Sequence, residues 1–266
     1  MASDVLDQEI NLHFSYFTIL DQPFTLLRNF NWYCTSFERP VMFLSLNIYD
    51  TVTLTKIGTN ETLPTTFLTQ DIKRLTREVE DCTILLYLPK PIYTDLHPNS
   101  LVSVTNIFAN VSKLYAFDIV SHKIAENEIV YSDRLENIRS ILKVCKTGII
   151  QIADIRYTSF RGSTNYELIQ KLNDLCKFNT LMLRKEDHVV NFDKDIIYKK
   201  CKVANCKVMK INDEYAVCSF DDQIFRARFF SEKDKNEIKN CSEIKVAYWK
   251  YENIIKSAFY ISCSSN

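Results

Sequence analysis

The chain has 266 residues, which is enough for one large domain or two of ordinary size. Its 33 basic side chains balance its 33 acidic ones, and this balance argues against a protein built mainly to coat nucleic acid, although it leaves room for a local basic patch. With only 3 glycines and 6 prolines there is no flexible or Pro-rich linker, so we expect the parts of the chain to pack closely.

The start of the chain and its cysteines indicate a reduced, cytoplasmic protein. Residues 1–10 carry three acids and no early apolar run, so the sequence predicts no signal peptide. No run of 18 apolar residues predicts a membrane span. The nine cysteines include no C-x-x-C pair, and no histidine pair completes a zinc pattern. We therefore expect nine free thiols, no disulfide, no metal and no cofactor.

Strands dominate the predicted elements. Residues 1–40 are apolar and aromatic and should add strands or a helix to the adjoining domain. Short runs rich in β-branched and aromatic residues then predict strands. These cover 42–49, 84–88, 101–107, 114–120, 128–131, 149–156, 215–220, 224–230 and 244–249.

Two segments have the apolar spacing of amphipathic helices, at 70–81 and 164–177. The second begins with Thr164 followed by Glu167, which is a capping-box pattern. In both halves of the chain a strand, a bend, a helix and a cluster of short strands occur in that order, which predicts a duplication.

The most informative stretch contains two aromatic-rich blocks, 220–228 (FDDQIFRAR) and 246–253 (VAYWKYEN). Aromatic rings at converging strand ends can surround a methylated ammonium or guanidinium, because ring faces attract cations. An amide at the rim can accept the remaining N–H.

These blocks resemble the Tudor family, whose pattern is an aromatic residue, a D-G turn, W-Y-R-A-R and then V-x-F-x-D-Y-G-N. The upstream strand and the helix at 164–177 resemble the extended Tudor form, in which they complete a nuclease-like, OB-type barrel. The family's aromatic cage falls on these five residues: Phe220, Phe225, Tyr248, Tyr251 and Asn253.

The resemblance implies a mostly β fold with helices, made of two tandem extended-Tudor-like units that are each a small β-barrel with an associated helix. The expected divisions are an N-terminal segment 1–40 packed on the first unit, a degenerate unit 41–145 and a second unit 146–266. It also implies a non-enzymatic adaptor that docks an arginine-methylated partner, of Argonaute type or another granule protein, in a small-RNA or ribonucleoprotein-granule pathway.

Two departures from the family pattern bear on the cage. Lys250 stands where the family has an acid, and Glu252 stands where it has glycine. Lys250 would face Arg226 or Arg228, and the like charges would repel. The first unit lacks the second tyrosine and the asparagine, so we expect any cage there to be broken.

Two alternatives compete with the adaptor. The first is a tandem OB-fold protein that binds single-stranded nucleic acid, since OB barrels also combine short strands with one helix. The second is a scaffold with inactive cages. The candidate nucleic-acid patch is a lysine run, and the balanced charge predicts weak or indirect binding. Its members are Lys194, Lys199, Lys200, Lys202, Lys207 and Lys210. No phosphate-loop, metalloprotease or hydrolase motif occurs, so the sequence predicts no enzyme.

Overall fold

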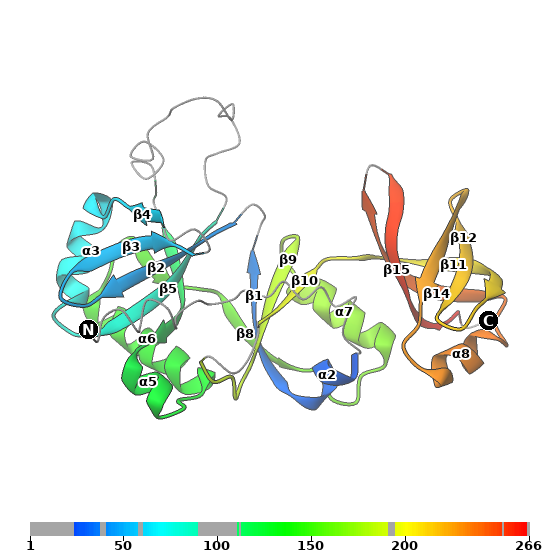
Figure 1. Ribbon diagram of the computed structural model, residues 1–266, viewed down its shortest axis with the longest axis horizontal. Helices are drawn as coiled ribbons and strands as arrows, with labels where there is room; N and C mark the ends of the chain where they lie inside the picture. Colours follow the sequence, from blue (N-terminus) through cyan, green and yellow to red (C-terminus); the bar gives the residue numbers. More distant parts are fainter. Residues whose placement is uncertain are drawn as a thin grey trace.

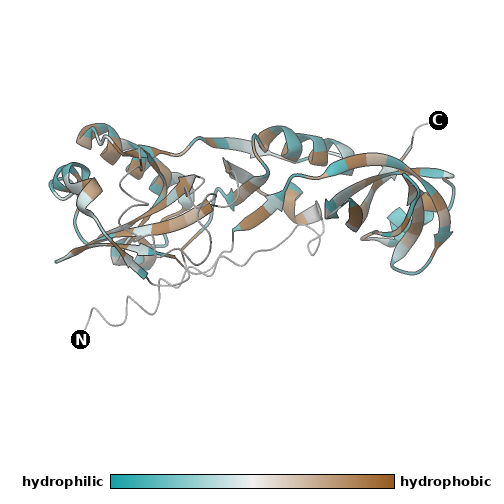
Figure 2. Cartoon of the chain, turned by 90° about the horizontal axis from the view of Figure 1, so that it is seen from above, coloured by the Kyte–Doolittle hydropathy of each residue, from teal (hydrophilic) through white to brown (hydrophobic). Residues whose placement is uncertain are grey.

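The computed structural model of the protein describes residues 24–37, 41–57, 61–89, 111, 113–190, 195–251 and 253–264. These residues form two open sheets and one closed barrel. The three bodies succeed one another along the long axis of the molecule (Figure 1). The view from above shows the same elongated row (Figure 2).

The first body is a six-stranded sheet in the order β4-β3-β2-β5-β6-β7, in which only β6 and β7 are parallel. Its strands are β2 (Val41–Ile48), β3 (Val52–Lys56), β4 (Glu61–Leu63), β5 (Cys82–Pro89), β6 (Leu114–Val120) and β7 (Ile150–Ile152). Its helices are η2 (Thr66–Leu68), α3 (Thr69–Leu75), α5 (His122–Glu126) and α6 (Tyr131–Cys145).

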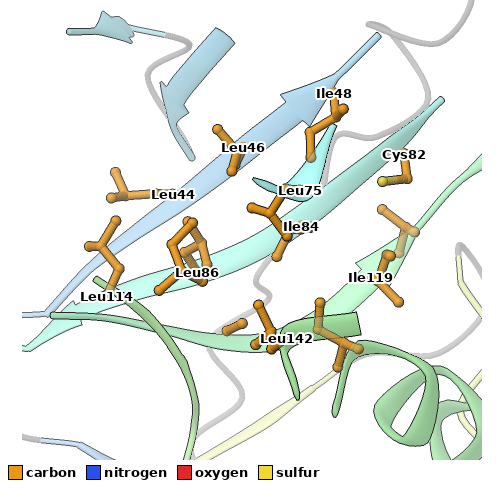
Figure 3. Packing of buried hydrophobic residues seen from close by; sticks show 14 of the residues in the cluster. Leu44, Leu46, Ile48, Leu75, Cys82, Ile84, Leu86, Leu114, Ile119 and Leu142 are labelled. Atoms are coloured by element: carbon orange, nitrogen blue, oxygen red, sulfur yellow. The ribbon is translucent and has the colours of Figure 1, made fainter. Parts of the chain in front are cut away.

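The core of this body lies between the sheet and its helices (Figure 3). The register of β2 and β5 sets Leu44 opposite Leu86 and Leu46 opposite Ile84, and all four side chains are fully buried. Burying one such side chain stabilises the fold by about 1.5–3 kcal/mol. The pairs therefore fix both the register and the face of the sheet that the helices cover.

One buried carboxylate joins α3 to the start of β7. Asp71 accepts backbone N–H bonds from Gly148, Ile149 and Ile150 at 2.7–2.8 Å. It is 3% exposed, so these bonds replace the water that the carboxylate loses on burial.

The second body is a four-stranded sheet in the order β10-β9-β1-β8, and all its pairs are antiparallel. Its elements are α2 (Phe24–Asn29), β1 (Asn31–Phe37), β8 (Ile155–Ser159), α7 (Asn165–Leu175), β9 (Thr180–Lys185) and β10 (Ile196–Lys199). The predicted helix at 164–177 is confirmed, with its complete capping box at Thr164. The predicted strand at 149–156 is divided, because β7 joins the first sheet and β8 the second.

The third body is a closed five-stranded barrel in the order β11-β12-β13-β15-β14, in which β14 returns to pair with β11. Its elements are β11 (Lys202–Ile211), β12 (Tyr215–Phe220), β13 (Gln223–Arg228), α8 (Glu232–Ile238), β14 (Glu243–Tyr251) and β15 (Ile254–Cys263). The helix lies between the third and fourth strands of the barrel, and the third and fifth strands are parallel. This is the connectivity of an OB-type Greek-key barrel.

The fold class predicted from the sequence, mostly β with helices and a small barrel, is confirmed. Two tandem barrels are not found, because the described residues of the first half form an open sheet. The strand predicted at 128–131 is wrong: Tyr131 begins α6, which places Leu135, Ile138 and Leu142 in the core at helical spacing. The strand predicted at 101–107 lies outside the described residues.

The prediction of nine free thiols is also wrong, because Cys241 and Cys263 form a disulfide. They are 22 residues apart and match no short motif, but β14 and β15 pair so that Ile244 lies opposite Cys263. Within the described part of the chain, no helix is long and apolar enough to cross a membrane. The same residues contain no cluster of potential metal ligands.

Candidate nucleic-acid interface

The five predicted cage residues gather at one end of the barrel, but two of the rings belong to its core. Phe225 is 9% exposed and Tyr248 is 5% exposed. Phe220 packs against Tyr248 with ring centroids 5.9 Å apart. Asn253 lies in the exposed turn before β15, where its carbonyl accepts a hydrogen bond from the Gln223 amide. Tyr251 is in β14, and its side chain is not among those that the structure describes.

Lys250 already covers these rings. Its Nζ is 6.0 Å from the centroid of Phe220 and 5.9 Å from that of Tyr248, which is cation–π distance. The same ammonium forms an ion pair with Asp221 at 3.1 Å. The expectation that Lys250 faces Arg226 or Arg228 is therefore wrong, and a cation of the chain itself takes the position that the cage would offer a ligand.

The predicted lysine run does not form one surface. Lys194 lies outside the described residues, and Lys199 ends β10 in the second body. Lys200 donates a hydrogen bond to the carbonyl of Cys176. Lys202 begins β11, and only the last two lysines of the run, Lys207 and Lys210, lie along the barrel strand beyond it.

The strand register brings a missed arginine beside these two lysines. Lys210 pairs with Val217, and Val217 pairs with Arg226, so one row crosses three strands. Successive residues of a strand point to opposite faces, so the buried neighbours of this row point into the barrel and the row itself points outward. Lys207 pairs with Ser219 in the next outward row, which ends at Ile224.

We call Lys207, Lys210 and Arg226 the barrel cations. In the described part of the chain no carboxylate lies within ion-pair distance of any of them, although Glu243 is the register partner of Lys207. The Arg226 guanidinium lies 4.7 Å from the ring centroid of Tyr215. The face is therefore cationic and carries at least one aromatic ring.

Exposed apolar side chains accompany these cations. Ile224 is 67% exposed and Met209 is 55% exposed, and they belong to β13 and β11. At the far end of β13, Arg228 lies near the acidic side chains of Asp213 and Glu214. The cations and the apolar side chains therefore share the middle of the face, where Lys207 and Ile224 belong to one cross-strand row. Acidic residues lie at both ends, because Asp221 and Asp222 form the exposed turn between β12 and β13.

A second group of charges is buried between the two open sheets. Asp118 of β6 accepts from Arg134 of α6 at 2.9 and 3.0 Å and also pairs with Arg184 of β9. Arg184 in turn donates to both oxygens of Asp195 at 2.7 and 2.6 Å. His188 Nδ1 lies 3.3 Å from Arg134 Nη2. All five residues are at most 7% exposed.

The pKa shifts of Asp118 and His188 in this network have physical causes. Burial alone would raise the pKa of Asp118, but Arg184 and Arg134 outweigh burial and hold that pKa below its usual range. Burial, together with the charge of Arg184, lowers the pKa of His188 to about 4. Shifted pKa values often mark functional sites, but structural ion-pair networks shift them too. No described member of this network faces solvent, so it joins the two sheets rather than meeting a ligand.

Aromatic and apolar side chains fill the rest of the junction between the sheets. Phe43 packs edge-to-face on both Phe37 and Phe117, at centroid distances of 5.6 and 5.9 Å. These side chains belong to a hydrophobic cluster with residues from both sheets. Its buried members are Phe37, Phe43, Leu85, Tyr87, Phe117, Ala153, Met182 and Ile197. The junction is therefore a packed core.

No protein-family model matches this chain, and no curated protein matches it. Solved structures that are similar to it include the Chlorella virus DNA ligase-adenylate, with 14% identity, 88% of this chain and 92% of that chain covered, and a TM-score of 0.38. A Lig E DNA ligase has 13% identity, coverage of 90% and 94%, and a TM-score of 0.43. The ligase domain of M. tuberculosis LigD has 10% identity, coverage of 88% and 89%, and a TM-score of 0.40.

These findings contradict the sequence-based identification. The similar structures are DNA ligases, so the assignments to the Tudor family, to methylarginine binding and to RNA silencing are wrong. The same structures contradict the prediction of a non-enzymatic adaptor. At these identities and scores, the activity of the ligases is not transferred to this chain. Arg226 is the residue that sequence reasoning missed, although strand alternation in R-A-R already sets it on the opposite face from Ala227.

Proposed function

We propose that this chain binds nucleic acid directly, through the outer face of β11, β12 and β13. The observation that carries the proposal is the cross-strand row from Lys210 through Val217 to Arg226, with Lys207 beside it. These cations come from two strands, and the register alone brings them together. Nucleic acid is then a direct ligand, and not the weak or indirect one expected from the balanced charge.

The chemistry of the face suits a phosphate backbone. Cations without a carboxylate partner on the described surface are available to phosphates, and each neutralised phosphate releases a counterion. In OB-type barrels, the face of the second and third strands is the one that binds oligonucleotides. Here those strands are β12 and β13, and β13 carries Arg226.

The other side chains of the face supply contacts beyond charge. Tyr215 presents a ring beside Arg226, and Ile224 and Met209 are more than half exposed. The bases of a single strand can pack against such side chains, whereas the bases of a duplex are already stacked on one another. Single-stranded and duplex probes therefore separate base contact from backbone contact.

The test is fluorescence anisotropy with a labelled 20-nucleotide DNA, single-stranded or duplex, at rising salt. Three phosphate contacts predict a slope of log affinity against log salt of about −2 for a single strand. Lys210→Glu should weaken binding by roughly tenfold, since it removes one contact and adds a repelling charge.

The matched control is Lys143→Glu. Lys143 is an exposed lysine of α6 in the first body, and its reversal changes the net charge by the same amount. If Lys143→Glu weakens binding as much as Lys210→Glu, attraction comes from net charge and the barrel face is not the site. A wild-type protein that binds neither probe at low salt would end the proposal.

A further inference from the structure

The disulfide lies at the edge of the proposed binding face. Cys241 comes after α8, and Cys263 ends β15, so the bond fastens the entrance of β14 to the last strand of the barrel. Both residues are partly exposed. The other seven cysteines are buried free thiols: Cys34, Cys82, Cys145, Cys176, Cys201, Cys206 and Cys218.

Two backbone contacts connect this bond to the barrel cations. Ser242, the residue after Cys241, accepts a hydrogen bond from the backbone N–H of Val208 at 2.9 Å. Glu243, the next residue, is the register partner of Lys207. The segment 241–243 therefore holds β11 at the point where β11 carries Lys207 and where its register with β12 shifts between Val208 and Lys210.

Hydrogen bonds and core packing also hold this corner of the barrel. Ile238 is fully buried in the barrel core, and Tyr260 donates a hydrogen bond to Glu237 at 2.9 Å, so α8 remains attached without the disulfide. Residues 239–241 would keep their hydrogen bonds to the last turn of α8, and the Glu243 carbonyl would still accept from the Ser264 N–H, so the disulfide adds a covalent link to these weaker contacts. Loss of the covalent bond should loosen this segment and leave the helix in place.

We infer that Cys241 and Cys263 form a reversible redox site that sets the affinity of the barrel for nucleic acid. This inference rests on the proposed function of the same face. In the oxidised state the bond holds the segment 241–243 and orders Lys207. In the reduced state the segment loosens, and Lys207 no longer holds its place beside Lys210 and Arg226.

The chemistry needs a dithiol reductant, either a small molecule or a thioredoxin-like protein. One thiolate of the reductant attacks a sulfur of the disulfide and forms a mixed disulfide. Its second thiol then displaces the protein sulfur. The reductant becomes a disulfide, and Cys241 and Cys263 gain two electrons and two protons as thiols.

The test first counts thiols in the denatured protein, before and after treatment with dithiothreitol. Seven reactive thiols should become nine, and a count of nine before treatment would overturn the inference. Anisotropy with single-stranded DNA should then show roughly three- to tenfold weaker binding after reduction, comparable to losing one phosphate contact. The double variant Cys241→Ser/Cys263→Ser should bind like the reduced protein and ignore the reductant. Equal affinity in both redox states, or a double variant that still responds, would contradict the inference.

Amide hydrogen exchange separates this inference from the proposed function, because it needs no nucleic acid. Reduction should speed exchange at the Val208 N–H, whose acceptor is Ser242. The Ala227 N–H, inside the pairing of β12 and β13, should not change. Protection of Val208 that is the same in both states overturns the redox coupling. If protection changes but no state binds DNA, the proposed function fails instead.

Discussion

Two groups of arginines in this chain have opposite surroundings. Arg134 and Arg184 are at most 1% exposed and share the carboxylates of Asp118 and Asp195 between the two open sheets. Arg226 is exposed on the barrel, with the ring of Tyr215 as its described neighbour. A buried guanidinium needs carboxylates to offset the cost of leaving water, whereas an exposed one keeps its water and remains available to phosphates.

The difference indicates that Arg134 and Arg184 stabilise the fold, whereas Arg226 is available to bind a ligand. Removing one partner of a buried pair leaves an uncompensated charge in the interior. Removing an exposed cation leaves the fold almost unchanged but deletes a contact to the ligand. Stability and affinity measurements on matched variants separate these two consequences.

The largest expected effect is that of Arg184→Met. It leaves Asp118 and Asp195 buried with one cation fewer, and should lower the free energy of unfolding by about 3–5 kcal/mol. Urea denaturation at pH 7 measures this. The matched variant Arg226→Met should stay within about 0.5 kcal/mol of wild type. Equal losses in the two variants would erase the distinction between the groups.

The pH dependence of stability sharpens the same comparison. The pKa of His188 in the fold is about 4, below the usual value of 6.5. The unfolded chain therefore takes up this proton first as the pH falls. The stability that comes from neutral His188 is present above pH 6.5 and is lost between pH 6.5 and 4, on the order of 3 kcal/mol.

Below that window, Asp118 adds to the loss, because its pKa in the fold is lower than its usual value. Its contribution is present above the unfolded pKa and disappears as the pH falls through the folded one. Unfolding midpoints measured from about pH 7.5 down to about pH 2 should show first the loss from His188 and then the loss from Asp118. His188→Gln should flatten the upper part of the curve, and a variant that keeps the full wild-type slope would assign the pH effect to other groups.

A smaller effect is expected for Arg226→Met on nucleic-acid affinity. Loss of one phosphate contact should weaken binding about fivefold and reduce the salt slope by about 0.7 for a single strand. Anisotropy at several salt concentrations measures both quantities. If affinity falls but the slope is unchanged, Arg226 acts through Tyr215 rather than through a phosphate.

The smallest expected effect is a gain of affinity. Glu243 lies opposite Lys207 in the register and repels phosphates near it. Glu243→Gln removes that charge and should tighten binding by roughly twofold, in line with the modest size of surface charge effects. Glu136→Gln, at an exposed position of α6, is the matched control and should have no effect on affinity.

Local signals in the sequence determined many of the elements. The β-branched and aromatic runs predicted β2, β5 and β6 close to their observed bounds, because side chains that suit a half-buried pleated surface are local properties. The Thr164 capping box likewise determined where α7 begins. Helix α6 could also have been predicted from its apolar spacing, but the β-branched and aromatic run over 128–131 indicated a strand instead.

Only the tertiary structure decided how these elements pair. The split of 149–156 between two sheets, the closure of β14 on β11 and the Cys241–Cys263 bond all depend on contacts between residues far apart in sequence. Aromatic strands of this kind can form either a ligand cage or a barrel core. In this chain Lys250 pairs with Asp221 and lies over the Tyr248 ring, a contact that the sequence alone does not reveal. The barrel cations lie together because of the strand register, and register depends on how strands pair rather than on the sequence of any one strand.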